Sequence, residues 1–127
     1  MHYNKKLLII EDEKNMRNTI KRTLKQGLPS VIILETGESK EALKIVEDSK
    51  PDLILLDVLM PNMNGLQVLK ALKESKNREI RKIPVIMLTG VGNIEIASIA
   101  KKMGAVSYIT KPFNEEIFLV KIKNYLV

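Results

Sequence analysis

The chain has no cysteine and no tryptophan, and it contains only one histidine, three tyrosines and two phenylalanines. The absence of cysteine excludes disulfide bonds, thiolate metal sites and cysteine nucleophiles, and it is compatible with a reducing compartment. So few aromatic rings argue against a base-stacking surface for single-stranded nucleic acid. The first apolar run, residues 7–10, is too short for a signal peptide or a membrane span. We therefore expect a cytoplasmic protein that has no contact with a membrane.

Basic residues are in excess, with 21 lysines and arginines against 15 acidic residues and a formal net charge of +6. Such a charge makes nucleic acid worth considering as a partner. The basic residues are scattered, however, so we interpret them as a solvated surface and expect no direct nucleic-acid binding by this domain. A chain of 127 residues is one domain, here 1–127, and can bury a core without a disulfide or a metal.

Short apolar runs alternate five times with longer amphipathic segments. The predicted strands are 7–10, 31–34, 53–56, 85–88 and 106–109, and the predicted helices are 14–26, 38–49, 65–75, 93–103 and a last helix capped by Asn114 that ends near 126. Continuous apolar strands between helices predict a doubly wound α/β fold, with a five-stranded parallel sheet and five helices. The charged segment 76–82 is interpreted as a solvated loop.

Three carboxylates follow the ends of two predicted strands: Glu11 and Asp12 follow the first strand, and Asp57 follows the third. Ligands of doubly wound sheets bind beyond the carboxyl ends of the strands. A single acid there is usually a helix cap or a loop charge, but three together repel one another unless a cation lies among them. Oxygen ligands without cysteine favour Mg²⁺ over zinc. We expect Asp12 and Asp57 to bind the metal directly and Glu11 to act through water.

A carboxylate in such a site can act as a nucleophile and form an aspartyl-phosphate, and Asp57 is the candidate. Lys111, after the fifth predicted strand, offers a positive charge for phosphoryl oxygens, and Thr89, after the fourth, offers a hydroxyl group. Each residue alone is unremarkable, but together they occupy the strand ends that one pocket would require.

These residues resemble the motif set of response-regulator receiver domains of two-component signalling, which includes the chemotaxis type. The resemblance covers about residues 5–126 and comprises Glu11-Asp12, Asp57 with Met60-Pro61 and Gly65, Thr89-Gly90, and Lys111-Pro112. It implies a flavodoxin-like sheet with strand order 2-1-3-4-5.

The resemblance also implies how the site works. Asp57 would take a phosphoryl group from a sensor histidine kinase or phosphotransferase, with Mg²⁺ held by the three acids and the backbone carbonyl of Leu59. Lys111 would bind the phosphate, the Lys111-Pro112 bond would be cis, Thr89 would move toward the phosphate and Tyr108 would turn inward. The surface of the fourth helix, fifth strand and fifth helix would then be recognised by a downstream partner, an output domain or a second copy, so the chain would be a monomer or a phosphorylation-dependent homodimer.

The protein would then be a phosphoacceptor that catalyses its own phosphorylation rather than an enzyme with a separate substrate. Leu59 and Val91 are apolar where some family members carry groups that assist an attacking water, which predicts slow self-dephosphorylation. The chain could stand alone or be the N-terminal part of a larger regulator.

Other classes fit less well. A phosphatase with an aspartate nucleophile would need a second acid at Leu59, and a dinucleotide-binding protein would need a glycine-rich loop where Glu11 and Asp12 would repel phosphate. A receiver-like interaction module that acts without phosphorylation remains the alternative. The first predicted helix carries a basic stripe, interpreted either as a solvated face or as a docking surface for a kinase: Lys14, Arg17, Lys21 and Lys25.

Overall fold

The computed structural model describes residues 4–60, 63–90 and 94–126. The strands are β1 (Lys6–Ile10), β2 (Ile32–Thr36), β3 (Leu53–Asp57), β4 (Val85–Gly90) and β5 (Ser107–Lys111). The helices are α1 (Lys14–Gly27), α2 (Ser39–Ser49), α3 (Gly65–Lys73), α4 (Arg78–Arg81), α5 (Ile94–Lys102) and α6 (Glu115–Leu126). The predicted alternation of strands and helices is confirmed, and strand and helix ends shift by a few residues.

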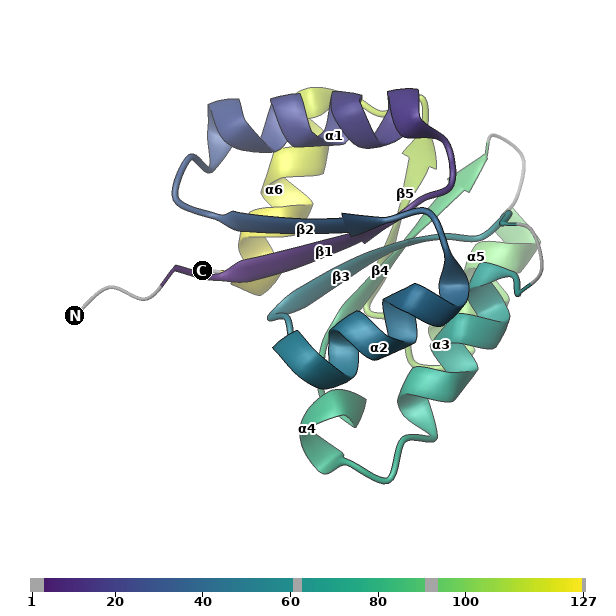
Figure 1. Cartoon of the computed structure of the whole chain (residues 1–127). Helices are drawn as coiled ribbons and strands as arrows, with labels where there is room; N and C mark the ends of the chain where they lie inside the picture. Colours follow the sequence, from purple (N-terminus) through teal and green to yellow (C-terminus); the bar gives the residue numbers. More distant parts are fainter. Residues whose placement is uncertain (1–3, 61–62, 91–93, 127) are drawn as a thin grey trace.

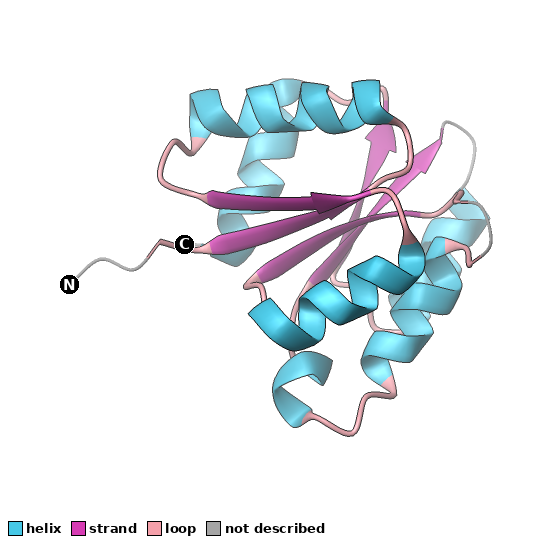
Figure 2. Cartoon of the chain, in the orientation of Figure 1, coloured by secondary structure: helices cyan, strands magenta, loops and turns pink. Residues whose placement is uncertain are grey.

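The five strands form one parallel sheet in the order β2-β1-β3-β4-β5, as the resemblance implies. All five strands run the same way in Figure 2, so their carboxyl ends share one edge of the sheet. Helices α1 and α6 cover one face, and α2, α3 and α5 cover the other (Figure 1). The doubly wound α/β fold is therefore confirmed.

Both faces of the sheet are packed, which explains the uninterrupted apolar runs of the central strands. Residues 7–10 of β1 and 53–56 of β3 are all fully buried. Alternate residues of each run face opposite sides, so Leu8 joins the core under α2, α3 and α5, whereas Leu7 joins the core under α1 and α6. Two cores share one sheet, and the site can therefore lie at the sheet edge without interrupting either core.

The prediction of five helices is wrong, because the described residues contain six. The charged segment 76–82, expected to be a solvated loop, contains the short helix α4. The side chain of Asn77 accepts a hydrogen bond from the Glu79 backbone N–H at 2.9 Å, and Ile80 is buried in the core. A cap and one buried residue are enough for a single turn, but too little for a periodic pattern in the sequence.

Side-chain caps mark the starts of two longer helices. Asn64 and Gln67 form a reciprocal capping box at α3, and the Asn114 side chain accepts a hydrogen bond from the Ile117 backbone N–H at 3.0 Å, which confirms the predicted cap of the last helix. Within the described parts of the chain, no helix is both long and apolar enough to cross a membrane.

Candidate functional site

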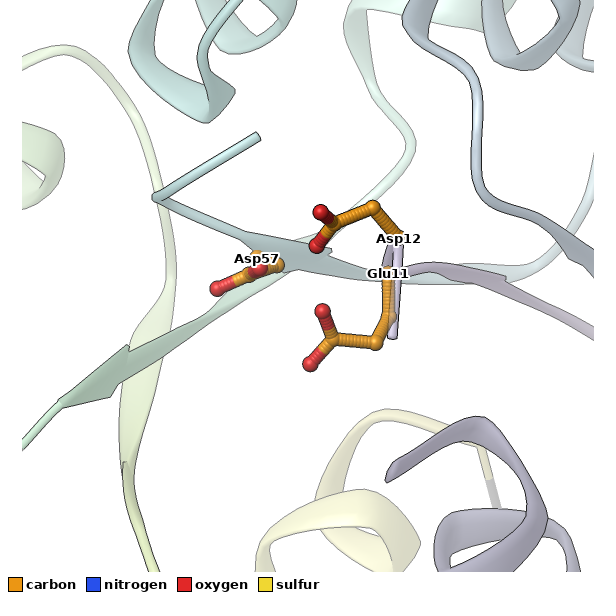
Figure 3. Close-up of side chains that lie close together, drawn as sticks. All are labelled: Glu11, Asp12 and Asp57. Carbon is orange, nitrogen blue, oxygen red and sulfur yellow. The ribbon is translucent and has the colours of Figure 1, made fainter. Parts of the chain in front are cut away.

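The strand register brings the three predicted acids to one point at the carboxyl edge of the sheet. Ile10 pairs with Leu56, so Glu11 follows β1 beside Asp57, the last residue of β3. Carboxylate oxygens of Glu11, Asp12 and Asp57 all lie within 4.8 Å of one another (Figure 3). Glu11 and Asp57 are only 1% and 3% exposed, whereas Asp12 is open to solvent. The structure therefore brings the three predicted acids together.

Lys111 bridges the two buried acids. Its ammonium nitrogen lies 3.0 Å from Glu11 Oε1 and 3.0 Å from Asp57 Oδ1. Burial by itself lowers the pKa of Lys111, but the hydrogen bonds to Glu11 and Asp57 outweigh it, and the net effect raises the pKa. Burial raises the pKa of Glu11 above its ordinary value, and the Asp57 carboxylate raises it further, although Lys111 acts in the opposite direction.

The cluster suits a hard divalent cation. Three carboxylates and one ammonium group leave an excess of negative charge, and all the carboxylate donors are oxygens. Mg²⁺ prefers oxygen ligands and is usually bound by one or two carboxylates together with water. The carbonyl of Leu59 as a further ligand remains a prediction; the Leu59 side chain itself is 65% exposed.

Gly65 lies directly behind Asp57. Its backbone N–H donates to the Val58 carbonyl at 2.8 Å, and a Cβ at this position would overlap the Asp57 carbonyl oxygen and lie 2.8 Å from Val58 Cα. The first turn of α3 therefore rests on the backbone of the acid itself. Any side chain at Gly65 would push Asp57 or the helix away, which gives this glycine a steric role in placing the acid.

Arg17 and Glu35 also belong to this edge, although the sequence did not place them in the site. Arg17 Nη1 donates to the Glu11 carbonyl at 2.7 Å and to the Asp12 carbonyl at 3.3 Å, and its Nε donates to Glu35 Oε1 at 3.0 Å. Lys21 Nζ lies 2.6 Å from Glu35 Oε2. Two members of the basic stripe on α1, Arg17 and Lys21, are therefore engaged in ion pairs with β2.

The sequence offered only one signal for this contact. Glu35 follows the second predicted strand, as the other acids follow theirs, yet the adjacent Thr36 and Gly37 are residues typical of turns. The turn is present, since the Thr36 hydroxyl accepts a hydrogen bond from the Glu38 backbone N–H at 3.1 Å. The turn and the ion pair occupy the same short segment, so the polar residues there did not reveal which of them has a partner.

The remaining predicted residues lie at or near the same edge. Thr89 is 2% exposed near the end of β4, one residue beyond Leu88, which pairs with Asp57. The peptide bond between Lys111 and Pro112 is cis. Thr89 thus occupies the next row of the sheet beyond the phosphoacceptor candidate.

Tyr108 lies on β5 and is half-buried. Lys121 of α6 donates from Nζ to the Tyr108 carbonyl at 2.6 Å, and the same nitrogen lies 5.1 Å from the centre of the Tyr108 ring. On the helices that flank β5, several large apolar side chains are exposed to solvent: Ile94 and Ile99 of α5, and Ile117, Val120 and Tyr125 of α6.

Known proteins share both the sequence pattern and the fold. Residues 7–123 match the family model of the response regulator receiver domain. The chain is 35% identical over 123 residues to the alkaline phosphatase synthesis transcriptional regulatory protein PhoP of Bacillus subtilis, covering 97% of this chain and 49% of that protein. It is 31% identical over 124 residues to the sporulation initiation phosphotransferase F of the same organism, covering 97% of this chain and 94% of that protein.

A solved structure extends the likeness to three dimensions. The chemotaxis response regulator CheY4 of Vibrio cholerae superimposes with a TM-score of 0.86 at 27% identity, covering 98% of this chain and all of that one. The chain spans about half the length of PhoP, so the likeness to PhoP concerns the matched half of that protein. The family match over most of the chain, the sheet order and the acid cluster lead to one conclusion: this chain belongs to the response-regulator receiver-domain family of two-component systems.

Proposed function

We propose that the chain receives a phosphoryl group on Asp57 from the phosphohistidine of a sensor histidine kinase or phosphotransferase, in a reaction that requires Mg²⁺. The observation that carries the proposal is the position of Lys111, whose ammonium group touches both buried carboxylates of the acid cluster. A cation held at this point can neutralise charge on a phosphoryl group without leaving its place.

The transfer is chemically balanced. A carboxylate oxygen of Asp57 forms a bond to phosphorus while the bond from phosphorus to the histidine nitrogen of the donor breaks, and the imidazole takes up a proton from solvent. Bound Mg²⁺ would neutralise charge on the phosphoryl oxygens and orient them, with Glu11, Asp12 and Asp57 as its ligands. Lys111 stays protonated, because its two carboxylate partners raise its pKa, and Thr89 offers its hydroxyl to the product.

The phosphorylated state would be read on the surface formed by α5, β5 and α6, which corresponds to the predicted fourth helix, fifth strand and fifth helix. The exposed isoleucines Ile94 and Ile99 of α5 support this assignment, because exposed apolar groups favour a protein contact. The partner is an output domain, a downstream protein or a second copy. The cytoplasmic location and slow dephosphorylation stay predictions, and Val91, on which the latter partly rests, lies outside the described residues.

Incubation with acetyl phosphate and Mg²⁺ followed by intact-mass measurement tests the proposal. We expect one added phosphoryl group that is lost in hydroxylamine, as an acyl phosphate should be, and no addition without Mg²⁺. Asp57→Asn should abolish the labelling. Asp52→Asn is the matched control, because Asp52 precedes the same strand at the opposite edge, where its side chain accepts a hydrogen bond from the Lys6 backbone N–H.

Absence of labelling in the wild type, or labelling that persists in Asp57→Asn, would overturn the proposal. Absence of labelling combined with partner binding that ignores both Mg²⁺ and phosphodonor would instead favour the interaction module that acts without phosphorylation.

A further inference from the structure

The backbone that carries Glu11 and Asp12 is held by a side chain from the helix that follows it. Arg17, one turn into α1, donates from Nη1 to the carbonyl oxygens of both acids, at 2.7 Å and 3.3 Å. The acidic side chains take part in the cluster, while their carbonyl groups bind the guanidinium. Arg17 thus fixes the segment that carries two of the three acids without joining the cluster itself.

The loop lacks the usual means of fixing a helix start. Glu13 is the N-cap of α1, but its side chain makes no capping hydrogen bond, and the first turn of the helix has no acidic residue. The one side-chain contact within the loop is long, from the Glu13 backbone N–H to Glu11 Oε2 at 3.4 Å. Among the described residues, Arg17 therefore supplies the side-chain hydrogen bonds to these two carbonyls, a short one to Glu11 and a longer one to Asp12.

The arginine is itself held in place by the neighbouring strand. Glu35 of β2 accepts from Arg17 Nε at 3.0 Å, so the planar guanidinium spans the loop after β1 and the end of β2. Lys21 binds the other oxygen of Glu35 at 2.6 Å. Hydrogen bonds from Lys21 and Arg17 lower the pKa of Glu35, so this counter-ion stays charged to a lower pH than an ordinary glutamate.

Gly37 leaves the space that the guanidinium occupies. A Cβ at this position would lie 2.9 Å from Arg17 Nη1, 3.3 Å from Asp12 Cα and 3.4 Å from the Glu11 carbonyl oxygen. The glycine, the arginine and the loop are therefore in mutual contact. A larger residue at Gly37 would have to displace the guanidinium or the acidic loop.

We infer that Arg17 is a positioning residue for the metal site, which it serves by fixing the Glu11–Asp12 backbone with Glu35 as its counter-ion and Gly37 as its spacer. The inference rests on the proposed function for the identity of the metal. Some residues orient a metal ligand by hydrogen bonds without touching the metal. Their removal typically lowers the metal affinity by about 10- to 100-fold. Arg17 should therefore act on the affinity for Mg²⁺ and on the Mg²⁺ concentration that phosphorylation requires.

The primary test is a titration of the isotope-labelled protein with MgCl₂, in which the backbone amide chemical shifts in NMR spectra report Mg²⁺ binding. Arg17→Met should raise the dissociation constant for Mg²⁺ by about 10-fold or more. Arg17→Lys should not restore it, because one ammonium group cannot reach both carbonyls and Glu35 in the planar arrangement of a guanidinium. Lys21→Met is the matched control, since it removes the other cation of Glu35 without touching the loop, and its dissociation constant should match that of the wild type.

The second readout is the initial rate of labelling by acetyl phosphate as a function of Mg²⁺ concentration. In Arg17→Met the midpoint should move to higher Mg²⁺ in parallel with the dissociation constant, while the rate at saturating Mg²⁺ stays at the wild-type level. If Arg17→Met does not fold, Gly37→Ala gives the same test, since its new Cβ crowds Arg17 Nη1 and should weaken Mg²⁺ binding.

Three outcomes separate the explanations. Wild-type Mg²⁺ affinity in both Arg17→Met and Gly37→Ala would overturn the inference. A lower free energy of unfolding or a lower saturating rate with an unmoved Mg²⁺ midpoint would assign Arg17 a purely structural role and overturn it too. A wild-type protein that binds Mg²⁺ but is not labelled would count against the proposed function alone, because the NMR titration tests Arg17 independently of it.

Discussion

Replacing Asp12 by asparagine should make the protein more stable in the absence of Mg²⁺. The acid cluster contains three carboxylates within 4.8 Å of one another, and the one ammonium group in contact with it binds the other two acids. Asp12 therefore contributes repulsion without a direct cationic partner among its described side-chain contacts. Asp12→Asn keeps the size of the side chain and removes this charge.

The size of the effect follows from the distances. At 4.8 Å, the upper limit of these separations, two unit charges repel by ~0.9 kcal/mol in bulk water and ~3.5 kcal/mol at an effective dielectric constant of 20. Asp12 is exposed to solvent, which favours the lower figure, and the attraction of Asp12 to Lys111 opposes the two repulsions. We expect a net gain of about 1 kcal/mol in the free energy of unfolding.

Urea unfolding monitored by circular dichroism measures this gain in the free energy of unfolding, first in EDTA and then at increasing Mg²⁺ concentrations. A ligand that binds only the folded state stabilises it in proportion to the logarithm of its concentration once it exceeds the dissociation constant. The wild type should therefore gain stability with Mg²⁺ and overtake Asp12→Asn, which should gain little. Glu13→Gln is the control, because it neutralises the neighbouring exposed acid outside the cluster.

Two results would refute this reasoning. If Asp12→Asn were less stable than the wild type in EDTA, the Asp12 carboxylate would be a net stabilising group rather than a source of repulsion. If the variant kept the full gain with Mg²⁺, Asp12 would not be a ligand of the metal.

Other substitutions test the remaining parts of the site. Gly65→Ala should cost about 1–3 kcal/mol and much of the labelling rate, because its Cβ would overlap the Asp57 carbonyl, whereas Gly27→Ala meets only a flexible leucine side chain and should cost little in urea unfolding. Lys111→Met should lower the free energy of unfolding by about 3 kcal/mol without Mg²⁺, since two buried carboxylates lose their counter-ion; an unchanged urea midpoint would contradict this. A neighbouring lysine and arginine lower the pKa of Glu35 from its ordinary 4.5, so the stability that this charge adds is present above pH 4.5 and lost as the pH falls through the lowered pKa. The wild type should thus exceed Glu35→Gln by up to about 1 kcal/mol at pH 7, and a difference that persists in acid would contradict the assignment.

The sequence predicted the sheet because its strands are buried on both faces. Residues 7–10 and 53–56 are apolar without interruption, and such runs between helical segments have few other interpretations. The acid cluster followed from the same logic, since parallel strands end at one edge and the acids come directly after the apolar runs. Local pattern and global topology agree at these positions, so prediction succeeded there.

The parts that the sequence did not predict depend on packing between distant residues. Helix α4 is a single turn that is fixed by the Asn77 cap and buried Ile80, and neither residue has a periodic signal. The contact of Arg17 with Glu35 joins residues 18 positions apart, and it requires the open space at Gly37. A regular spacing of cations on a helix cannot show which of them faces the sheet.

The same register that makes the sheet stable also makes the site. Leu56 pairs with Ile10 and with Met87, so the last wholly apolar row of the central strands lies one residue before Asp57. Moving the acid back by one position would place a carboxylate among fully buried side chains, where it would need a partner in the core or a neutral state. Moving it forward by one would place the carboxylate at Val58, which is itself buried in the core under α2, α3 and α5. The acid is therefore confined to one position in this segment, between two residues of the apolar core, at which Lys111 reaches its carboxylate.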